Sequence, residues 1–431
     1  MNKKAVEWLY EQLPELVAKE IIPTASVKLI REHYGAVDKK HGGRTVFAMF
    51  GIIGVILVGL GIILILAHNW DQLSRMTRVL IAVGLLIIAQ ALVGATVWYK
   101  KSNVVWSEST STFLMISIGT SIALIGQTYH LGDNFSNFLL TWMLLAIPLV
   151  YLMGVTTPAL LYLVGVTTWG VSGEFSDISK QLIWVLLALM GPYYWGLMRK
   201  NLYANSTVMI SWVLILCVYI SFGTAFATTV QHLSILMYAA LFAITYFIGI
   251  IWFEDAIKVW QKPFKLIGLM GCVTLSFLLT FKDVWRSIGR NIYSIEKSEY
   301  LLAFLLFAVV VVLGTRVIHK KTNKYHLFGG VPVVAMVGFL LMHFDASGIN
   351  STVLLNGYML FMSVAIIFRG AQEGSLGTLN IGMLMVAFLI IMRFLDVNFS
   401  FVARGLVFVV LGICFLSANW IMVRRNKEVT K

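Results

Sequence analysis

The sequence predicts an all-α, polytopic integral membrane protein with about 14 transmembrane helices and a short cytosolic helical hairpin at its N-terminus. Hydrophobic residues make up 59% of the 431 positions and charged residues only 12%, whereas soluble domains are roughly half apolar and about 25% charged. The mean hydropathy is +0.85. The apolar residues also form runs of about 20, the length that crosses a hydrocarbon core about 30 Å thick. We therefore expect a membrane, not water, to surround most of the chain.

The strongly basic composition does not indicate a nucleic-acid partner. The formal charge is +13, from 33 lysines and arginines against 20 acidic residues. A nucleic-acid-binding surface gathers its basic residues on one folded face. Here they stand in short clusters between apolar runs, which is the distribution that the positive-inside rule describes. The basic clusters are therefore interpreted as the cytoplasmic ends of transmembrane helices.

Residues 1–44 are predicted to fold as two short helices outside the membrane. Trp8, Leu9, Leu13 and Leu16 recur at helical spacing in the first. Pro23 breaks the chain, and Gly35 can end the second. A hairpin of this kind would lie on the cytoplasmic face and bind anionic lipid through its lysines. The alternative is a docking surface for a cytosolic or membrane protein partner.

Residues 45–431 are predicted to form the transmembrane domain, with one span on each apolar run of sufficient length. The fifth run is short and carries Gly165 and Gly170, so thirteen spans with a re-entrant segment is the alternative. The predicted spans are 45–67, 77–99, 111–127, 137–153, 156–172, 181–198, 207–227, 234–252, 264–281, 299–315, 327–343, 351–368, 377–394 and 401–423.

The distribution of basic residues predicts the orientation. With the N-terminus in the cytoplasm and an even number of spans, 24 of the 33 lysines and arginines fall on the cytoplasmic side and nine outside. This bias predicts that both termini are cytoplasmic. Because the first 44 residues lack the apolar core of a cleavable signal peptide, we expect the first span to act as the targeting element.

The common catalytic and metal-binding signatures are missing. The sequence contains no GxxxxGK[ST] phosphate loop, no HExxH and no GxSxG elbow. Cys217, Cys272 and Cys414 each lie within an apolar run and form no CxxC pair, so they are interpreted as small buried hydrophobic residues. We expect no cofactor and no metal, and we expect that the chain is not an enzyme.

Polar residues gather at the predicted outer ends of the spans. Ionisable groups within a span are costly and usually face a cavity or a partner, which favours Arg78 and Arg404 as ligands of an anionic group; snorkelling to the headgroups is the alternative. His130 and Asp133 are three residues apart, so a helical segment would bring imidazole and carboxylate together. If the outer hairpins are neighbours, these side chains line one cavity. The candidate binding residues are Asp71, Arg78, His130, Asp133, Asp396 and Arg404.

Two further features concern helix geometry. Pro148, Pro192 and Pro332 lie in predicted spans, and broken helices form the binding site of many transporters. The longest outer loop, residues 282–298, is interpreted as an amphipathic helix lying on the membrane.

Three stretches carry a resemblance to a known family. They are GIILILAHNWDQLSRMTRVLIA, QTYHLGDN, and RFLDVNFSFVARGLVFVVLGICFLSAN with the basic tail that follows. Together they resemble the bacterial predicted membrane proteins catalogued as domain of unknown function 2157. The resemblance implies a helical membrane fold and a bacterial inner-membrane location, and it implies no activity. The positions that look like the family's motif are Asn69, Trp70, Asp71, Arg78, His130 and Asp133.

These features predict a transporter- or flippase-like protein for a small or lipid-linked anionic solute. In this hypothesis Arg78 and Arg404 bind the anionic group, and Asp71 and His130 couple its movement to an ion. One alternative is a non-catalytic scaffold or regulatory subunit that recruits a partner through residues 1–44. The other is an integral membrane enzyme acting on an envelope lipid or glycan, with His130 or Asp133 as general base.

Overall fold

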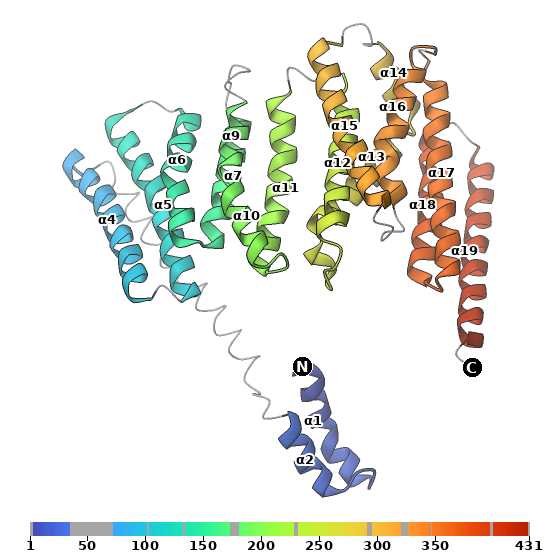
Figure 1. Ribbon diagram of the computed structural model, residues 1–431, viewed down its shortest axis with the longest axis horizontal. Helices are drawn as coiled ribbons and strands as arrows, with labels where there is room; N and C mark the ends of the chain where they lie inside the picture. The colour runs from blue at the N-terminus through green and yellow to red at the C-terminus, as the bar shows by residue number, and fades with distance from the viewer. Residues whose placement is uncertain are drawn as a thin grey trace. The chain divides into compact units, whose positions relative to one another are not determined.

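Helices form every element of the computed structural model within the residues it describes, which contain no strand (Figure 1). The described residues are 3–34, 72–100, 103–131, 134–172, 181–227, 232–290, 295–319, 326–345, 347–396 and 400–429. The predicted all-α class is confirmed. The chain divides into two compact units, residues 1–81 and 82–431. The predicted boundary after residue 44 lies outside the described residues and stays a prediction.

The first unit contains two helices at the positions that the sequence predicts. They are α1 (Lys3–Ala18) and α2 (Thr24–Tyr34). The Tyr10 hydroxyl donates a hydrogen bond to the carbonyl oxygen of Arg31 at 3.5 Å. The guanidinium carbon of Arg31 lies 5.8 Å from the centre of the Tyr10 ring. The two helices therefore contact each other, and their cytosolic location stays a prediction.

The second unit begins within α4 (Arg75–Tyr99) and contains all the helices that follow. Helices that are adjacent in sequence commonly pack side by side, α5 with α6, α12 with α13, and α17 with α18. The elements after α4 are α5 (Val104–Tyr129), α6 (Phe135–Met153), α7 (Thr156–Ser172), α9 (Leu182–Ala188), α10 (Gly191–Lys200), α11 (Asn205–Ala225), α12 (Ser234–Trp252), η2 (Val259–Gln261), α13 (Pro263–Leu278), α14 (Lys282–Arg290), α15 (Lys297–His319), η4 (His326–Gly330), α16 (Val331–Leu341), α17 (Ile349–Gln372), α18 (Leu376–Asp396) and α19 (Phe401–Val429).

The described residues contain ten helices long and apolar enough to cross a membrane, and the bent pair α13–α14 would make an eleventh. This supports a membrane protein with multiple spans but does not confirm the predicted number of 14. The predicted span 45–67 lies outside the described residues. The spans predicted at 156–172 and 327–343 fall on short helices, since α7 has 17 residues and α16 has 11. Apolar composition marks a run of residues but does not show where its helix begins or breaks.

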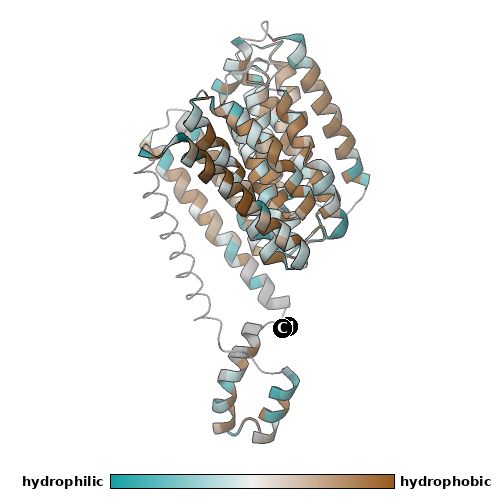
Figure 2. Ribbon diagram, turned by 90° about the vertical axis from the view of Figure 1, so that its left-hand side faces the viewer, coloured by the Kyte–Doolittle hydropathy of each residue, from teal (hydrophilic) through white to brown (hydrophobic). Residues whose placement is uncertain are grey.

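Apolar side chains cover the outer surfaces of the helices as well as the contacts between them. Figure 2 shows hydrophobic residues along the helices and hydrophilic residues near many of the helix ends. On α15, for example, Leu301 and Phe304 are 62% and 69% exposed. An apolar exterior of this kind suits lipid. The helices can lie in lipid because their backbone N–H and C=O groups are hydrogen-bonded within each helix.

Glycines allow two helix pairs to pack with their backbones in contact. On α12 and α13, a Cβ added at Gly249 would collide with the backbone of Lys265, and one added at Gly268 would collide with the backbone of Tyr246. Gly370 and Gly382 make the corresponding close contacts between α17 and α18. Small residues of this kind are the usual basis of close helix packing in membranes. These two pairs therefore form the most tightly packed part of the second unit.

Two carboxylates hold the N-termini of neighbouring helices. Glu108 of α5 accepts hydrogen bonds from the backbone N–H groups of Thr156 and Thr157, at 2.7 and 2.9 Å, at the start of α7. Glu299 of α15 is 1% exposed and accepts bonds from the backbone N–H groups of His232 and Leu233, at 3.1 and 3.0 Å, before α12. A carboxylate at a helix N-terminus satisfies donors that lack an intrahelical partner. Both acidic residues therefore have structural roles.

The cysteine prediction is correct for two of three residues. Cys217 and Cys272 are buried, whereas Cys414 is exposed. Cys414 lies on α19, and none of the residues of this helix between 404 and 421 is buried. The apolar run around Cys414 faces outward, because α19 packs mainly against α18.

Candidate functional site

Only part of the predicted binding site lies within the described residues. Asp71 and Asp133 lie outside them, and Asp396 is described only as the last backbone residue of α18. Arg78 lies in the first turn of α4, in the first unit. Because Arg78 belongs to a different unit from His130 and Arg404, its convergence with them is not tested.

His130 and Arg404 lie on helices of the second unit that are not neighbours. His130 follows α5 in a left-handed conformation (φ 51°), and its side chain is exposed. Arg404 lies in the first turn of α19, with its guanidinium carbon 5.6 Å from the centre of the Phe401 ring. Helix α5 packs against α6 and α7, and α19 packs against α18; Figure 1 draws these two groups at opposite ends of the second unit. The structure therefore does not bring His130 and Arg404 together, and the binding roles of the six residues stay predictions.

A different polar site lies at the break between α13 and α14, whose axes differ by 82°. The predicted span 264–281 ends at this bend. The backbone N–H groups of Leu279 and Thr280 still bond to carbonyls of the last turn of α13, those of Leu275 and Phe277, at 2.9 and 3.1 Å. The backbone N–H of Phe281 bonds to the carbonyl oxygen of Leu278 at 3.2 Å, and the chain then turns away. The carbonyls of Leu279 and Thr280, just past the end of α13, therefore lack the donors that a continuing helix would supply.

Side chains from two helices supply those missing donors. The indole nitrogen Nε1 of Trp285, on α14, donates to the carbonyl oxygen of Leu279 at 2.7 Å. The amide nitrogen Nδ2 of Asn356, on α17, donates to the carbonyl oxygen of Thr280 at 3.0 Å. Trp285 and Thr280 are both fully buried. The break is therefore a buried polar feature whose carbonyl groups are hydrogen-bonded by side chains.

Arg393 of α18 supplies the positive charge at this break. Its Nη2 atom donates to the Thr280 hydroxyl at 3.0 Å, and its guanidinium carbon lies 5.1 Å from the centre of the Phe281 ring. The Thr280 hydroxyl in turn donates to the carbonyl oxygen of Phe277 at 2.6 Å. A cation at the C-terminal end of α13 is favoured by the negative end of the helix dipole. The half-buried guanidinium is therefore stabilised where the helix breaks.

The short helix α14 adds further positive charge to the same corner. It carries three basic residues, Lys282, Arg286 and Arg290, and one acidic residue, Asp283. The carboxylate oxygen Oδ1 of Asp283 lies 3.4 Å from Nη1 of Arg286. Basic residues therefore outnumber acidic ones on α14, and such an excess attracts anions.

Helix α14 is amphipathic, as the sequence predicts, but its apolar side faces protein. Trp285 and Ile288 are 0% and 6% exposed. An alanine at Gly338, on α16, would meet the Trp285 ring, and α14 also packs against α17. The predicted placement on the membrane through this apolar side is therefore wrong, because protein already covers that side.

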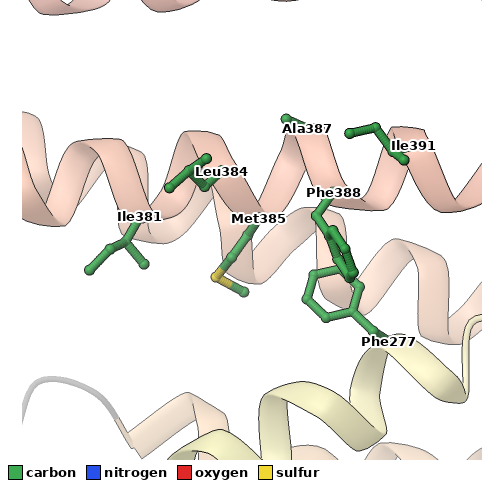
Figure 3. A pocket seen from close by; sticks show the side chains of 7 residues that line it. All are labelled: Phe277, Ile381, Leu384, Met385, Ala387, Phe388 and Ile391. Carbon is green, nitrogen blue, oxygen red and sulfur yellow. The ribbon is translucent and has the colours of Figure 1, made fainter.

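An apolar groove lies directly beside the break. Phe277 of α13 and six side chains of α18 between positions 381 and 391 line a cavity of about 360 Å³. Figure 3 shows Ile381, Met385 and Phe388 extending from α18 toward α13. The Phe277 and Phe388 rings meet edge to face, with centroids 4.7 Å apart. The carbonyl oxygen of Phe277 also accepts the hydrogen bond that the Thr280 hydroxyl donates. Phe277 therefore belongs to both the groove and the break.

At the break, the guanidinium of Arg393 suits anion binding better than acid–base chemistry. The Thr280 hydroxyl already donates to the carbonyl oxygen of Phe277, and the Asn356 amide donates to the carbonyl oxygens of Thr280 and Thr352, so these two side chains position the break. A guanidinium is permanently charged and matches phosphate and carboxylate geometry. Among the residues that the structure describes, no three His, Cys, Asp or Glu side chains are grouped to hold a metal ion.

Asp345, a polar residue between α16 and α17, caps a helix. Its carboxylate accepts hydrogen bonds from the backbone N–H groups of Ser347 at 3.0 Å and Asn350 at 3.3 Å. Together with the Ser347 hydroxyl, these bonds hold the pKa of the Asp345 carboxyl below its ordinary value. The residue therefore organises the turn that leads into α17.

Comparison with known families identifies the N-terminal part of the chain. Residues 14–159 match the model of a family described as predicted membrane protein (DUF2157). No curated protein and no solved structure matches the chain. The match confirms the resemblance over the N-terminal stretch and the QTYHLGDN turn. It ends within α7, so the break between α13 and α14 and the hairpin of α18 and α19 lie outside it.

The DUF2157 match covers less than half of the chain and does not include the break. The residues of the break are therefore known from the structure and not from the match. Arg393 is recognisable in the sequence as a basic residue within an apolar span. Asn356 gives a weaker signal, as a lone amide in the predicted span 351–368. Thr280 gives none, because its role depends on where α13 ends.

Proposed function

We propose that this protein moves an anionic solute, small or lipid-linked, across the bacterial inner membrane, with both termini in the cytoplasm. The observation that supports this most strongly is Arg393 at the broken end of α13. Discontinuous helices are common at the binding sites of transporters, where the N-termini of half-helices face anionic groups, and α14 begins at Lys282 directly after the break. A basic residue within an apolar span is also costly and is usually retained for function.

The predicted outer residues keep their roles within this proposal. Arg78 and Arg404 contribute to binding the anionic group at another stage of its path, and Asp71 and His130 couple the movement to an ion. Asp133 and Asp396 belong to the same outer set. The absence of catalytic signatures in the sequence favours movement of the solute over its covalent conversion.

Complementation of a deletion strain tests the proposal. We expect Arg393→Ala to abolish complementation, because the alanine removes the cation from the break. Arg424→Ala is the matched control, since Arg424 also lies beside an aromatic ring, with its guanidinium carbon 5.6 Å from the centre of Trp420, but at the exposed end of α19. Membrane fractions must contain equal amounts of each protein.

The outcomes separate the proposal from its alternatives. Full complementation by Arg393→Ala, Arg78→Ala and Arg404→Ala would overturn it. If only deletion of residues 1–44 abolished function, the protein would be a scaffold. An enzyme would be indicated if the covalent structure of a lipid or glycan changed in the deletion strain. The wild-type protein would then restore that structure, and His130→Ala would not.

A further inference from the structure

We infer that the groove between α13 and α18, together with the Arg393 corner, binds a membrane lipid whose phosphate-containing head carries a net negative charge. This inference rests on the proposed function and names the class of solute: a lipid phosphate rather than a free inorganic or organic anion. The apolar chain lies in the groove and the phosphate lies at the break, as the following contacts indicate.

The composition and position of the groove suit an acyl or isoprenoid chain. All seven lining side chains are apolar. Ile381 and Leu384 are 57% and 59% exposed, so a chain can enter from the side without leaving the hydrocarbon region. Figure 3 shows no polar side chain among those that line this groove. A free anion would gain nothing from such a surface, whereas a hydrocarbon chain gains contact along its length.

The length of the groove matches the depth of one leaflet. From Ile381 to Ile391 the helix α18 rises about 15 Å at 1.5 Å per residue, half of a hydrocarbon core about 30 Å thick. Arg393 lies two residues beyond Ile391, near the end of α18. A lipid whose chain follows the groove therefore has its head at the level of Arg393.

The corner has the charge and chemistry that recognise a phosphate. Arg393 can hold phosphate oxygens in bidentate geometry, and the neighbouring helix α14 carries three basic residues and one acidic residue. The groove and the corner are directly connected through Phe277, which lines the groove. The carbonyl oxygen of Phe277 accepts a hydrogen bond from the Thr280 hydroxyl, and Arg393 donates to that hydroxyl. Head and chain sites therefore join at one residue.

Native mass spectrometry of the full-length protein in detergent tests this inference. The probes are dioleoyl phosphatidylglycerol, dioleoyl phosphatidylcholine and inorganic phosphate. We expect the anionic lipid to bind at least tenfold more tightly than the zwitterionic lipid with the same chains. Arg393→Ala should remove this preference, and Arg424→Ala should retain it.

The groove is tested separately with a matched pair of exposed leucines. Leu384→Gln places an amide in the groove, and Leu416→Gln places one on α19, where the leucine is 75% exposed. We expect only Leu384→Gln to weaken binding of the anionic lipid, by about tenfold. Both leucines are more than half exposed, so neither change removes a core contact.

Each result decides the inference. Equal binding of the two lipids to wild type would mean ordinary annular lipid and would overturn it. A second pair of results would identify a free-anion site and also overturn the inference. In that case inorganic phosphate would bind the wild type but not Arg393→Ala, and Leu384→Gln would bind the anionic lipid as tightly as the wild type does. In that case a requirement for Arg393 in complementation would leave the proposed transport function standing. Full complementation by Arg393→Ala, Arg78→Ala and Arg404→Ala would overturn the proposed transport function as well.

Discussion

Thr280 is the residue at which four elements of the candidate site meet. It follows α13, its hydroxyl receives the bond from Arg393 of α18, and its carbonyl receives the bond from Asn356 of α17. The chain then enters α14. Thr280 is fully buried, so each of its polar atoms needs a partner within the protein. The geometry of the break therefore depends on side chains that are distant in sequence.

Replacing Asn356 with leucine, which has a similar shape, is predicted to destabilise the protein. The change leaves the buried carbonyl of Thr280 without the amide donor, a loss of about 1–3 kcal/mol. The control is Asn350→Leu, because Asn350 is exposed in the first turn of α17. Thermal unfolding in detergent should show a lower Tm for Asn356→Leu only. Equal Tm values would mean that the amide does not hold the break.

Sequence reasoning at this scale finds charges more readily than partners. Arg393 and Arg404 stand out as basic residues in apolar runs, whereas the partner of His232 cannot be seen in the sequence. In the structure, Nδ1 of His232 lies 3.1 Å from the Glu299 carboxylate. The roles of Glu108 and Glu299 could not be predicted, since both residues bind backbone N–H groups, which every residue except proline carries.

At the scale of elements, close helix pairing depends on glycines placed where two backbones cross. Gly249 and Gly268 serve α12 and α13, and Gly370 and Gly382 serve α17 and α18. The pairing holds α13 rigidly against α12 up to the break. The position of the site therefore depends on this packing as well as on its own hydrogen bonds.

The variant Gly268→Ala is predicted to lower stability by about 1–3 kcal/mol, the usual cost of overpacking. The new methyl group would meet the backbone nitrogen of Tyr246, which cannot rotate away. Gly357→Ala is the control, because no atom lies within 4 Å of a Cβ at that position in α17. Guanidinium or thermal unfolding compares the two. A Gly268→Ala protein as stable as wild type would show that α12 and α13 can separate without cost.

The positions of the helices could be predicted from apolar runs, but their continuity could not. The predicted span 234–252 coincides with α12. The run 264–281 is predominantly apolar, yet its helix ends at Leu278 and turns by 82° into α14. Side chains of α14, α17 and α18 hydrogen-bond to Leu279 and Thr280 at the bend, and composition does not reveal these contacts.

At the scale of the whole molecule, the chain joins a family-matched N-terminal region to a C-terminal half that carries the candidate site. The DUF2157 match ends at residue 159, within α7. The predicted outer residues Asp71, Arg78, His130 and Asp133 lie within the matched region, and Arg393 lies outside it. The proposed transport path therefore needs contributions from both regions.

The orientation prediction can be tested with single cysteines in a background that lacks the native three. Ser287→Cys on α14 and Lys200→Cys at the end of α10 are both exposed positions. Three helices, α11 to α13, separate them. With cytoplasmic termini, a membrane-impermeant maleimide should label position 287 in intact cells and position 200 only after permeabilisation. The reverse pattern would place the Arg393 corner at the cytoplasmic face.

A cryo-EM structure of the protein in nanodiscs containing phosphatidylglycerol tests the proposed site most directly. We predict a lipid phosphate within hydrogen-bonding distance of Arg393, with one chain along the groove between Phe277 and Phe388. A straight helix through residues 264–290, or a groove filled by a lipid whose head lies away from Arg393, would contradict it.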